Sequence, residues 1–270
     1  MRTPNIIDGN ALPKAHSVKD FLVLVIVLSI PIWLVGGAKL PLPVNLPVSA
    51  LTAFVPMIAA AILVFRRRGS KGMKELFQEA RDYRNINHKV WYLPILFLAP
   101  FLYLISFVVI RLTGRPLPDP IQIPILWLPV FLLLYLISGA GEELGWTAYA
   151  TEPMLNRWGV WAAGFLLGII WAVWHSIAFV QTGSAMEWVI WQSVKTVATR
   201  MIIVWIYYKT EKSVFAAILY HTADNVSWSL FPNVSSHYDP LVTGLVNGAA
   251  ILMIILIEKL TGFARSRAPQ

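Results

Sequence analysis

Cysteine is absent from the 270 residues, which excludes disulfide bonds and any catalysis or metal binding by a thiolate. Charged residues are also scarce, at 13% of the chain, whereas globular domains are about a quarter charged. A soluble domain of this length would need far more charge to cover its surface. The composition therefore excludes an ordinary soluble protein.

Hydrophobic residues make up 57% of the chain, the mean hydropathy is +0.63, and the apolar residues occur in long blocks. A helix needs about 20 apolar residues to cross the hydrocarbon core of a bilayer. On this criterion the sequence predicts an all-α integral membrane protein, one domain over residues 1–270, with a bundle of about eight transmembrane helices. The blocks are Phe21–Val35, Leu46–Phe65, Val90–Ile110, Ile121–Ile137, Val160–Val180, Trp188–Tyr208, Val214–Leu230 and Leu241–Ile257.

The net charge of +8 is concentrated in one place. Eight Lys and Arg residues lie between positions 66 and 89, and the positive-inside rule places this basic loop in the cytoplasm. With eight spans, both termini are then cytoplasmic, and the outer loops hold only Lys39, Arg111 and Arg115. The charge therefore predicts an orientation in the plasma membrane and contact with membrane lipid, and no binding of nucleic acid. The first block is expected to be a retained anchor, because no small-residue cleavage pattern follows it.

Ionisable side chains inside apolar blocks are costly in lipid and are functional candidates by default. Four clusters of polar residues interrupt the second half of the chain. They lie at Ser138–Thr147 with Glu142 and Glu143, at Trp171–His175, at Gln192–Arg200 with Lys195, and at His221–Asn225 with Asp224. Together they predict one functional core over residues 121–231.

Spacing indicates that these clusters meet. Glu142 and His175 lie almost equally far from a helix turn predicted near Gly159, so an antiparallel pair would place them at the same height. His221 and Asn225 are four residues apart and share one helix face. We expect the three groups to line a cavity that opens to the cytoplasm.

Hydrolysis of a peptide bond needs an activated water and a group that stabilises the oxyanion. A carboxylate in a partly dehydrated site can act as general base, and histidine and asparagine can donate to an oxyanion. Glu142 or Glu143 with His175, and His221 with Asn225, fit these roles. Carboxylate and imidazole are also ordinary Zn²⁺ ligands, so Glu142, His175 and His221 are the candidate metal ligands. The chain has no HExxH motif, and no serine nucleophile stands out.

Three ordered motifs carry a family resemblance: EELGWT at residues 142–147, Trp171 followed four residues later by His175, and His221 followed by Asn225. They resemble the EExxxR, [FW]xxxH and HxxxN motifs of the CPBP family, which includes type II CAAX prenyl endopeptidases and bacteriocin-processing membrane proteins (the Abi family). The resemblance implies an eight-helix membrane fold and an intramembrane protease, often labelled a metalloprotease. It also implies that Glu142 is the general base assisted by His175, and that His221 and Asn225 stabilise the oxyanion.

One position departs from the family pattern. Thr147 stands where the motif has arginine, and in the family that arginine would pair with the second glutamate, here Glu143. Arg200, in another apolar block, is an otherwise unexplained cation. Because intramembrane charges normally pair inside the bundle, we predict that Arg200 supplies the missing guanidinium to Glu143.

Other functions remain open at this stage. The expected substrate is a peptide or a lipid-anchored protein segment, but the same polar cluster could serve a non-catalytic immunity or partner-binding protein. A proton-relaying transporter is a further alternative, although the two halves of the chain show no repeat. Lys195 is expected to extend toward the membrane surface, and Asp224 to point away from the His221 face.

Overall fold

The computed structural model describes residues 18–38 and 47–261. Nearly all of these residues are helical, and the described part contains no β-sheet. The α-helices are α1 (Val18–Leu34), α2 (Val55–Glu79), α3 (Tyr92–Leu112), α4 (Leu128–Gly145), α5 (Glu152–Gln181), α6 (Met186–Lys209), α7 (Val214–Leu230), α8 (Pro232–Ser235) and α9 (Pro240–Leu260). A 3₁₀ segment, η1 (Val48–Phe54), leads into α2, and a π-helical turn, η5 (Trp146–Thr151), joins α4 to α5.

Each of the eight predicted blocks overlaps one of the long helices, so the all-α prediction is confirmed. Five helical stretches in the described chain are long and apolar enough to cross a bilayer. One of them, Ile125–Gln181, holds both α4 and α5 and bends at Gly159, where φ is 75°. The helices α1 and α7 have 17 residues each, and their crossing of the membrane remains a prediction. The bend at Gly159 lies where the helix turn was predicted.

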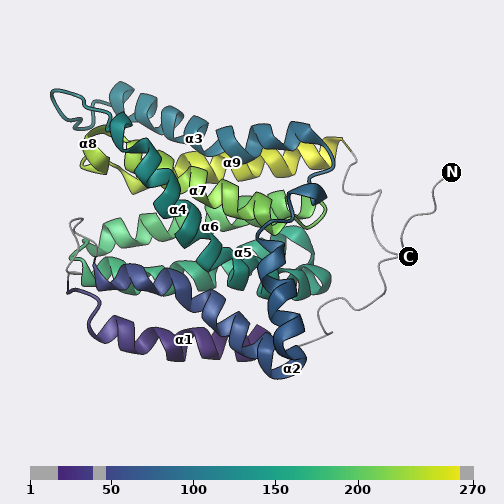
Figure 1. The fold of residues 1–270 in the computed structure, drawn as a ribbon. Helices are drawn as coiled ribbons and strands as arrows, with labels where there is room; N and C mark the ends of the chain where they lie inside the picture. The colour runs from purple at the N-terminus through teal and green to yellow at the C-terminus, as the bar shows by residue number, and fades with distance from the viewer. Residues whose placement is uncertain (1–17, 39–46, 262–270) are drawn as a thin grey trace.

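The long helices run side by side between two ends of the bundle (Figure 1). At one end Arg67 lies 3.9 Å from Asp20, and Asp82 accepts a hydrogen bond from Ser213 at 2.7 Å. We call this the basic end, because the predicted basic loop is there. At the opposite end Gln181 donates to the carbonyl of Trp33. The α5–α6 turn and α8 therefore belong to this opposite end.

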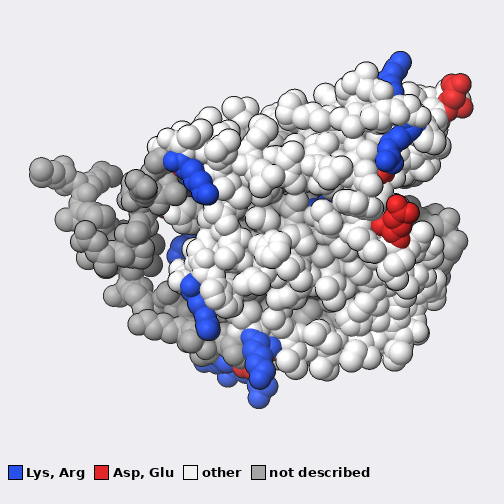
Figure 2. Space-filling view, turned by 180° about the vertical axis from the view of Figure 1, so that it is seen from behind, with Lys and Arg blue, Asp and Glu red and all other residues white. Residues whose placement is uncertain are grey.

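The surface of the bundle is apolar between its two ends. On the face shown in Figure 2, charged residues lie mainly toward the two ends, and the broad band between them is almost free of charge. Large apolar side chains point outward along the helices, including Leu252 at 69% exposure and Leu133 at 63%. A soluble protein rarely exposes so much contiguous apolar surface. This surface and the apolar helices identify a multi-pass membrane protein.

The predicted basic loop is helical over much of its length, which corrects the prediction of a loop from residue 66 to 89. The helix α2 continues to Glu79 and changes direction at Gly69, where φ is 57°. Glycine suits that position because a left-handed backbone carries little steric cost without a Cβ atom. Leu76 on the second part of α2 is fully buried, so packing rather than loop flexibility holds this segment.

Two glycines bring α4 against α2 and η1. A Cβ atom on Gly145 would lie 2.4 Å from the Pro56 backbone, and one on Gly141 would lie 2.7 Å from the carbonyl oxygen of Ala53. Only hydrogen fits at such contacts. This close approach fixes the position of the two glutamates, which lie between the glycines on α4.

We expect Gly145→Ala to lower the free energy of unfolding by about 1–3 kcal/mol, because the added methyl group must push α4 from α2. A Cβ atom on Gly248 of α9 would have no atom within 4 Å, so Gly248→Ala is the matched control and should be neutral or slightly stabilising. Thermal unfolding of both variants in detergent checks this. Equal stability of the two variants would contradict the tight contact.

Candidate active site

The polar clusters of four helices meet around one cavity of about 160 Å³. Residues from α4, α5, α6 and α7 form most of its wall, and α3 adds one side chain. The lining consists of Tyr103, Glu142, Trp171, His175, Phe179, Trp188, Gln192, Lys195, Thr196, Thr199, His221, Asp224, Asn225 and Trp228. The predicted core of residues 121–231 therefore supplies every wall residue except Tyr103.

Glu142 lines this cavity and is only 6% exposed. One carboxylate oxygen, Oε2, accepts a hydrogen bond from the indole Nε1 of Trp171 at 2.6 Å. The other, Oε1, lies 3.8 Å from His175 Nε2 and 4.0 Å from His221 Nε2. One oxygen is therefore held by the protein, while the other faces two imidazole rings.

His175 is oriented by its own helix. Its Nδ1 lies 2.9 Å from the carbonyl oxygen of Trp171, one turn earlier on α5. A carbonyl can only accept, so Nδ1 carries the proton and the neutral ring has a lone pair on Nε2. The side chain is 24% exposed, and its free nitrogen faces Glu142. The ring is thus presented as an acceptor toward the cavity.

Glu143 is completely buried and binds three partners. Its Oε2 accepts from Arg200 Nη1 at 2.7 Å and from Thr147 Oγ1 at 2.5 Å, and its Oε1 lies 2.7 Å from His221 Nδ1. The predicted contact between Arg200 and Glu143 is therefore present. Thr147, which occupies the arginine position of the motif, binds the same carboxylate as a hydroxyl donor.

The guanidinium of Arg200 is also fully buried and stacks on the ring of Trp171, with its Cζ atom 4.0 Å from the ring centroid. Among the described residues, its Nε and Nη2 atoms have no hydrogen-bond partner. Removing one member of a buried ion pair leaves an uncompensated charge. Glu143 and Arg200 are therefore a coupled pair that holds α4 to α6 beneath the cavity.

His221 and Asn225 project from α7 into the cavity, as their spacing predicted. The Asn225 side chain is partly exposed and has no hydrogen-bond partner within the described chain.

The start of α7 is held by Asp82, which accepts from the backbone N–H groups of Val214 and Phe215 at 2.9 Å each. Burial raises the pKa of Asp82, and these hydrogen bonds oppose that rise.

The structure corrects the predictions for Lys195 and Asp224. Lys195 does not extend to the surface: its Nζ atom lies 2.5 Å from Asp224 Oδ2, and both side chains are buried in the cavity wall. Asp224 therefore lines the same cavity as His221. Sequence reasoning treated the two charges separately, although one cation and one anion in neighbouring apolar blocks already suggested a pair.

The cavity wall differs in exposure along its length. One end of the cavity wall is buried; Thr199 there is 0% exposed. Exposure increases toward Phe179 and Trp188, on either side of the α5–α6 turn, and Trp228 near the end of α7 is 36% exposed. The exposed wall residues therefore lie toward the end of the bundle opposite the basic end, and the opening toward the cytoplasm remains a prediction.

Zinc binding remains a prediction. Within the described ranges, no group of three His, Asp or Glu side chains is arranged to hold a metal ion. Glu142, His175 and His221 converge, and each ring binds Trp171 or Glu143 through Nδ1 and turns Nε2 toward Glu142, at 3.8 and 4.0 Å, which is compatible with ligand chemistry. We derive no step through a metal.

Two comparisons with known proteins concern this region. The family model for the type II CAAX prenyl endopeptidase Rce1-like proteins matches residues 124–227. CAAX prenyl protease 2 of Methanococcus maripaludis is 28% identical over 126 residues, which cover 44% of this chain and 45% of the relative. The chain thus aligns with about half of that protein. The resemblance to the type II CAAX prenyl endopeptidases is therefore confirmed over residues 124–227, the segment that carries all three motifs.

Proposed function

We propose that this protein is an intramembrane endopeptidase that hydrolyses a peptide bond in a membrane-associated peptide or lipid-anchored protein. The observation that carries the proposal is the position of Glu142 Oε1, which faces the Nε2 atoms of His175 and His221 at 3.8 and 4.0 Å inside a buried cavity. These separations are too long for direct hydrogen bonds. They suit a bridging water molecule.

Glu142 and His175 would hold the attacking water. Both Glu142 Oε1 and His175 Nε2 are acceptors, so one water can donate a hydrogen to each at about 2.8 Å. Its oxygen lone pair then remains free to attack a carbonyl carbon. The Trp171 indole holds the second oxygen of Glu142, which keeps the carboxylate in this orientation. In this arrangement Glu142 is the general base.

The attack would form a carbon–oxygen bond and transfer one water proton to Glu142. The negative charge then develops on the carbonyl oxygen of the substrate, where His221 and Asn225 can donate hydrogen bonds. Glu143 supports this role, because a carboxylate bound to Nδ1 orients the ring and stabilises positive charge on it. The carbon–nitrogen bond then breaks as Glu142 returns its proton to the leaving amine.

Glu143 and Arg200 are positioning residues in this mechanism. Glu143 binds His221, and Arg200 binds Glu143 while its guanidinium covers the face of Trp171. The buried guanidinium of Arg200 therefore helps to position two groups. One is Trp171, which donates to Glu142, and the other is the His221 ring, which faces the oxyanion. This is the role that the motif arginine would have from position 147 in η5, here filled from α6.

Trp171→Phe tests whether the indole N–H positions the base. The variant keeps an aromatic face beside Arg200 but removes the donor to Glu142. A hydrogen bond to a charged group contributes about 1.5–3 kcal/mol, so we expect kcat to fall about 10- to 100-fold, together with a loss of thermal stability because Trp171 is buried. Unchanged kcat would show that Glu142 does not depend on this contact.

The proposal is tested with purified protein in nanodiscs and a library of membrane-anchored peptides, with and without prenyl or acyl chains. Products are identified by mass spectrometry, and bound metal is measured on the same samples. Cleavage at a defined bond supports the endopeptidase. Retention of intact peptides by folded protein, without any cleavage, would instead support the partner-binding alternative. Cleavage that requires stoichiometric metal would contradict the metal-free mechanism.

A further inference from the structure

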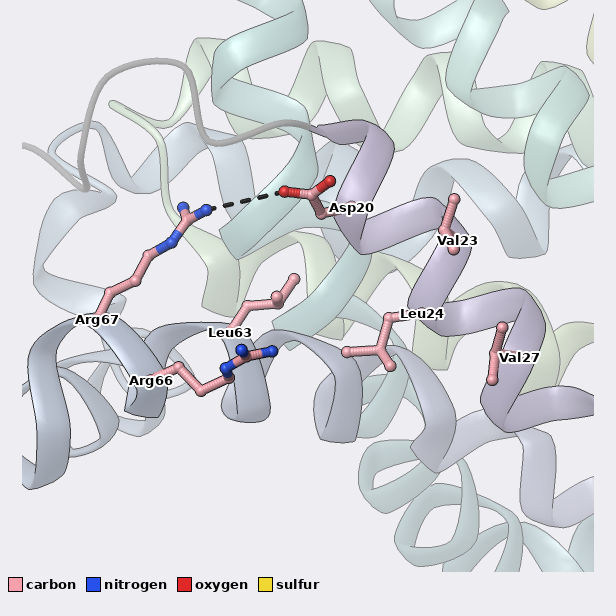
Figure 3. A pocket seen from close by; sticks show the side chains of 7 residues that line it. All are labelled: Asp20, Val23, Leu24, Val27, Leu63, Arg66 and Arg67. Atoms are coloured by element: carbon pink, nitrogen blue, oxygen red, sulfur yellow. Dashed lines mark ion pairs between the residues drawn. The ribbon is translucent and has the colours of Figure 1, made fainter.

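We infer that a groove between α1 and α2, at the basic end of the bundle, binds a membrane phospholipid with an anionic headgroup. The groove has a volume of about 530 Å³. It is lined by Asp20, Val23, Leu24 and Val27 of α1 and by Leu63, Arg66 and Arg67 of α2 (Figure 3). None of these seven residues lines the cavity around Glu142. Lipid binding here is therefore independent of the proposed peptidase function.

The apolar wall of the groove faces outward from the bundle. Val23 and Val27 lie one turn apart on α1 and are 52 and 53% exposed, whereas Leu63 of α2 is buried. Ile30, which is also exposed, continues the same face of α1. From Asp20 to Ile30 the helix rises about 15 Å at 1.5 Å per residue, which is half of the roughly 30 Å hydrocarbon core. One acyl chain of a phospholipid can therefore lie along this face.

Two guanidinium groups lie at one end of this apolar wall. Figure 3 shows the Arg66 side chain pointing from α2 across the groove toward α1, and Arg66 forms no ion pair with the described residues. Arg67 lies 3.9 Å from Asp20, which is a long contact. The next residue, Arg68, is paired with Glu75 at 2.5 Å instead. The groove therefore carries two cations against one anion.

An anionic phospholipid matches both parts of the groove. Its phosphate carries one negative charge and accepts paired hydrogen bonds from a guanidinium group. A zwitterionic headgroup would bring a further cation beside Arg66 and Arg67, and a free phosphate would leave the apolar wall uncovered. A peptide segment on this outer face would leave backbone N–H and C=O groups unpaired in lipid. The chemistry of the groove therefore favours a lipid over a peptide.

Native mass spectrometry of the whole protein tests the headgroup site. Phosphatidylglycerol and phosphatidylcholine with identical acyl chains are added in equal amounts, and we expect the protein to retain phosphatidylglycerol preferentially. A cation near the membrane surface strengthens binding of an anionic lipid about 5-fold. Arg66→Gln should therefore weaken retention about 5-fold, and Arg66→Gln combined with Arg67→Gln about 25-fold. The control, Arg81→Gln with Arg84→Gln, removes the same charge from exposed positions outside the groove and should retain the lipid as the wild type does.

Val27→Trp tests the acyl-chain wall, because the indole fills the groove without changing its charge. We expect it to reduce the retention of phosphatidylglycerol, whereas Leu252→Trp, at an exposed apolar position on α9 outside the groove, should not. Full retention by Val27→Trp would show that the arginines attract lipid without a groove and would overturn the site.

Three other results would also overturn the lipid site. The first is equal retention of the two lipids by the wild type, and the second is equal weakening in both pairs of arginine variants. The third is a dimer that retains no phosphatidylglycerol and that Val27→Trp dissociates, which would assign the groove to a second copy of the chain. Because each readout is bound lipid or mass, a failure of the proposed peptidase function is seen separately, in the cleavage assay.

Discussion

Glu142→Gln is expected to reduce the rate of peptide cleavage by about 10³-fold, within the range of 10²–10⁴ that general-base catalysis contributes. Glutamine has nearly the same shape, and its carbonyl oxygen can still accept the hydrogen bond from Trp171. It cannot accept the proton of the attacking water. The loss should therefore appear in kcat, measured by mass spectrometry on a peptide that the wild type cleaves, with little change in KM.

The control for this variant is Glu258→Gln. Glu258 on α9 is also a buried carboxylate, only 8% exposed, and it accepts a hydrogen bond from Trp205 at 2.8 Å. It lies outside the cavity wall, so its neutralisation should leave cleavage unchanged. Equal activity of Glu142→Gln and wild type would remove Glu142 from the mechanism. Equal loss in both variants would indicate a general effect of removing buried charge.

Arg200→Met is expected to lower the free energy of unfolding by about 3–5 kcal/mol, because it leaves Glu143 as an unpaired buried charge. Methionine retains much of the apolar stem of arginine. The decrease in the free energy of unfolding therefore reflects the loss of the charge more than the loss of side-chain volume. Glu143 would keep only the hydrogen bonds of Thr147 and His221. Thermal unfolding in detergent, with the monodisperse fraction as a second measure, checks the effect.

The double variant Arg200→Met with Glu143→Gln separates charge from packing. Both ionic groups are then absent, and replacing a buried pair as a unit is often nearly neutral. We expect the double variant to recover most of the lost stability, since contacting residues couple in a double-mutant cycle. Its activity should stay low, because His221 has lost its carboxylate partner. Additive losses in the double variant would contradict direct coupling of Arg200 and Glu143.

Much of the candidate site could be predicted from the chain alone. Glu142, His175, His221 and Asn225 were identified from three spaced motifs, and all four line one cavity. The contact between Arg200 and Glu143 followed from two arguments: the family's motif arginine would pair with the second glutamate, and an unexplained cation in lipid needs an anion. Lys195 was misjudged because its long stem allows two outcomes, and only the position of Asp224 across the helix interface decides between them.

The sequence by itself determined that this is a helical membrane protein, because backbone groups in lipid must be satisfied within each segment and apolar blocks therefore become helices. It also predicted which residues line the candidate site, since their types and spacing are local properties of the chain. Only the tertiary structure decided which end of the cavity wall is buried and which is exposed. That difference depends on how Trp146, Ile203 and Tyr220, from three separate elements, pack together at one end, while aromatic side chains near the α5–α6 turn are partly exposed at the other. No local sequence pattern predicts that these side chains, which are far apart in the chain, pack against one another.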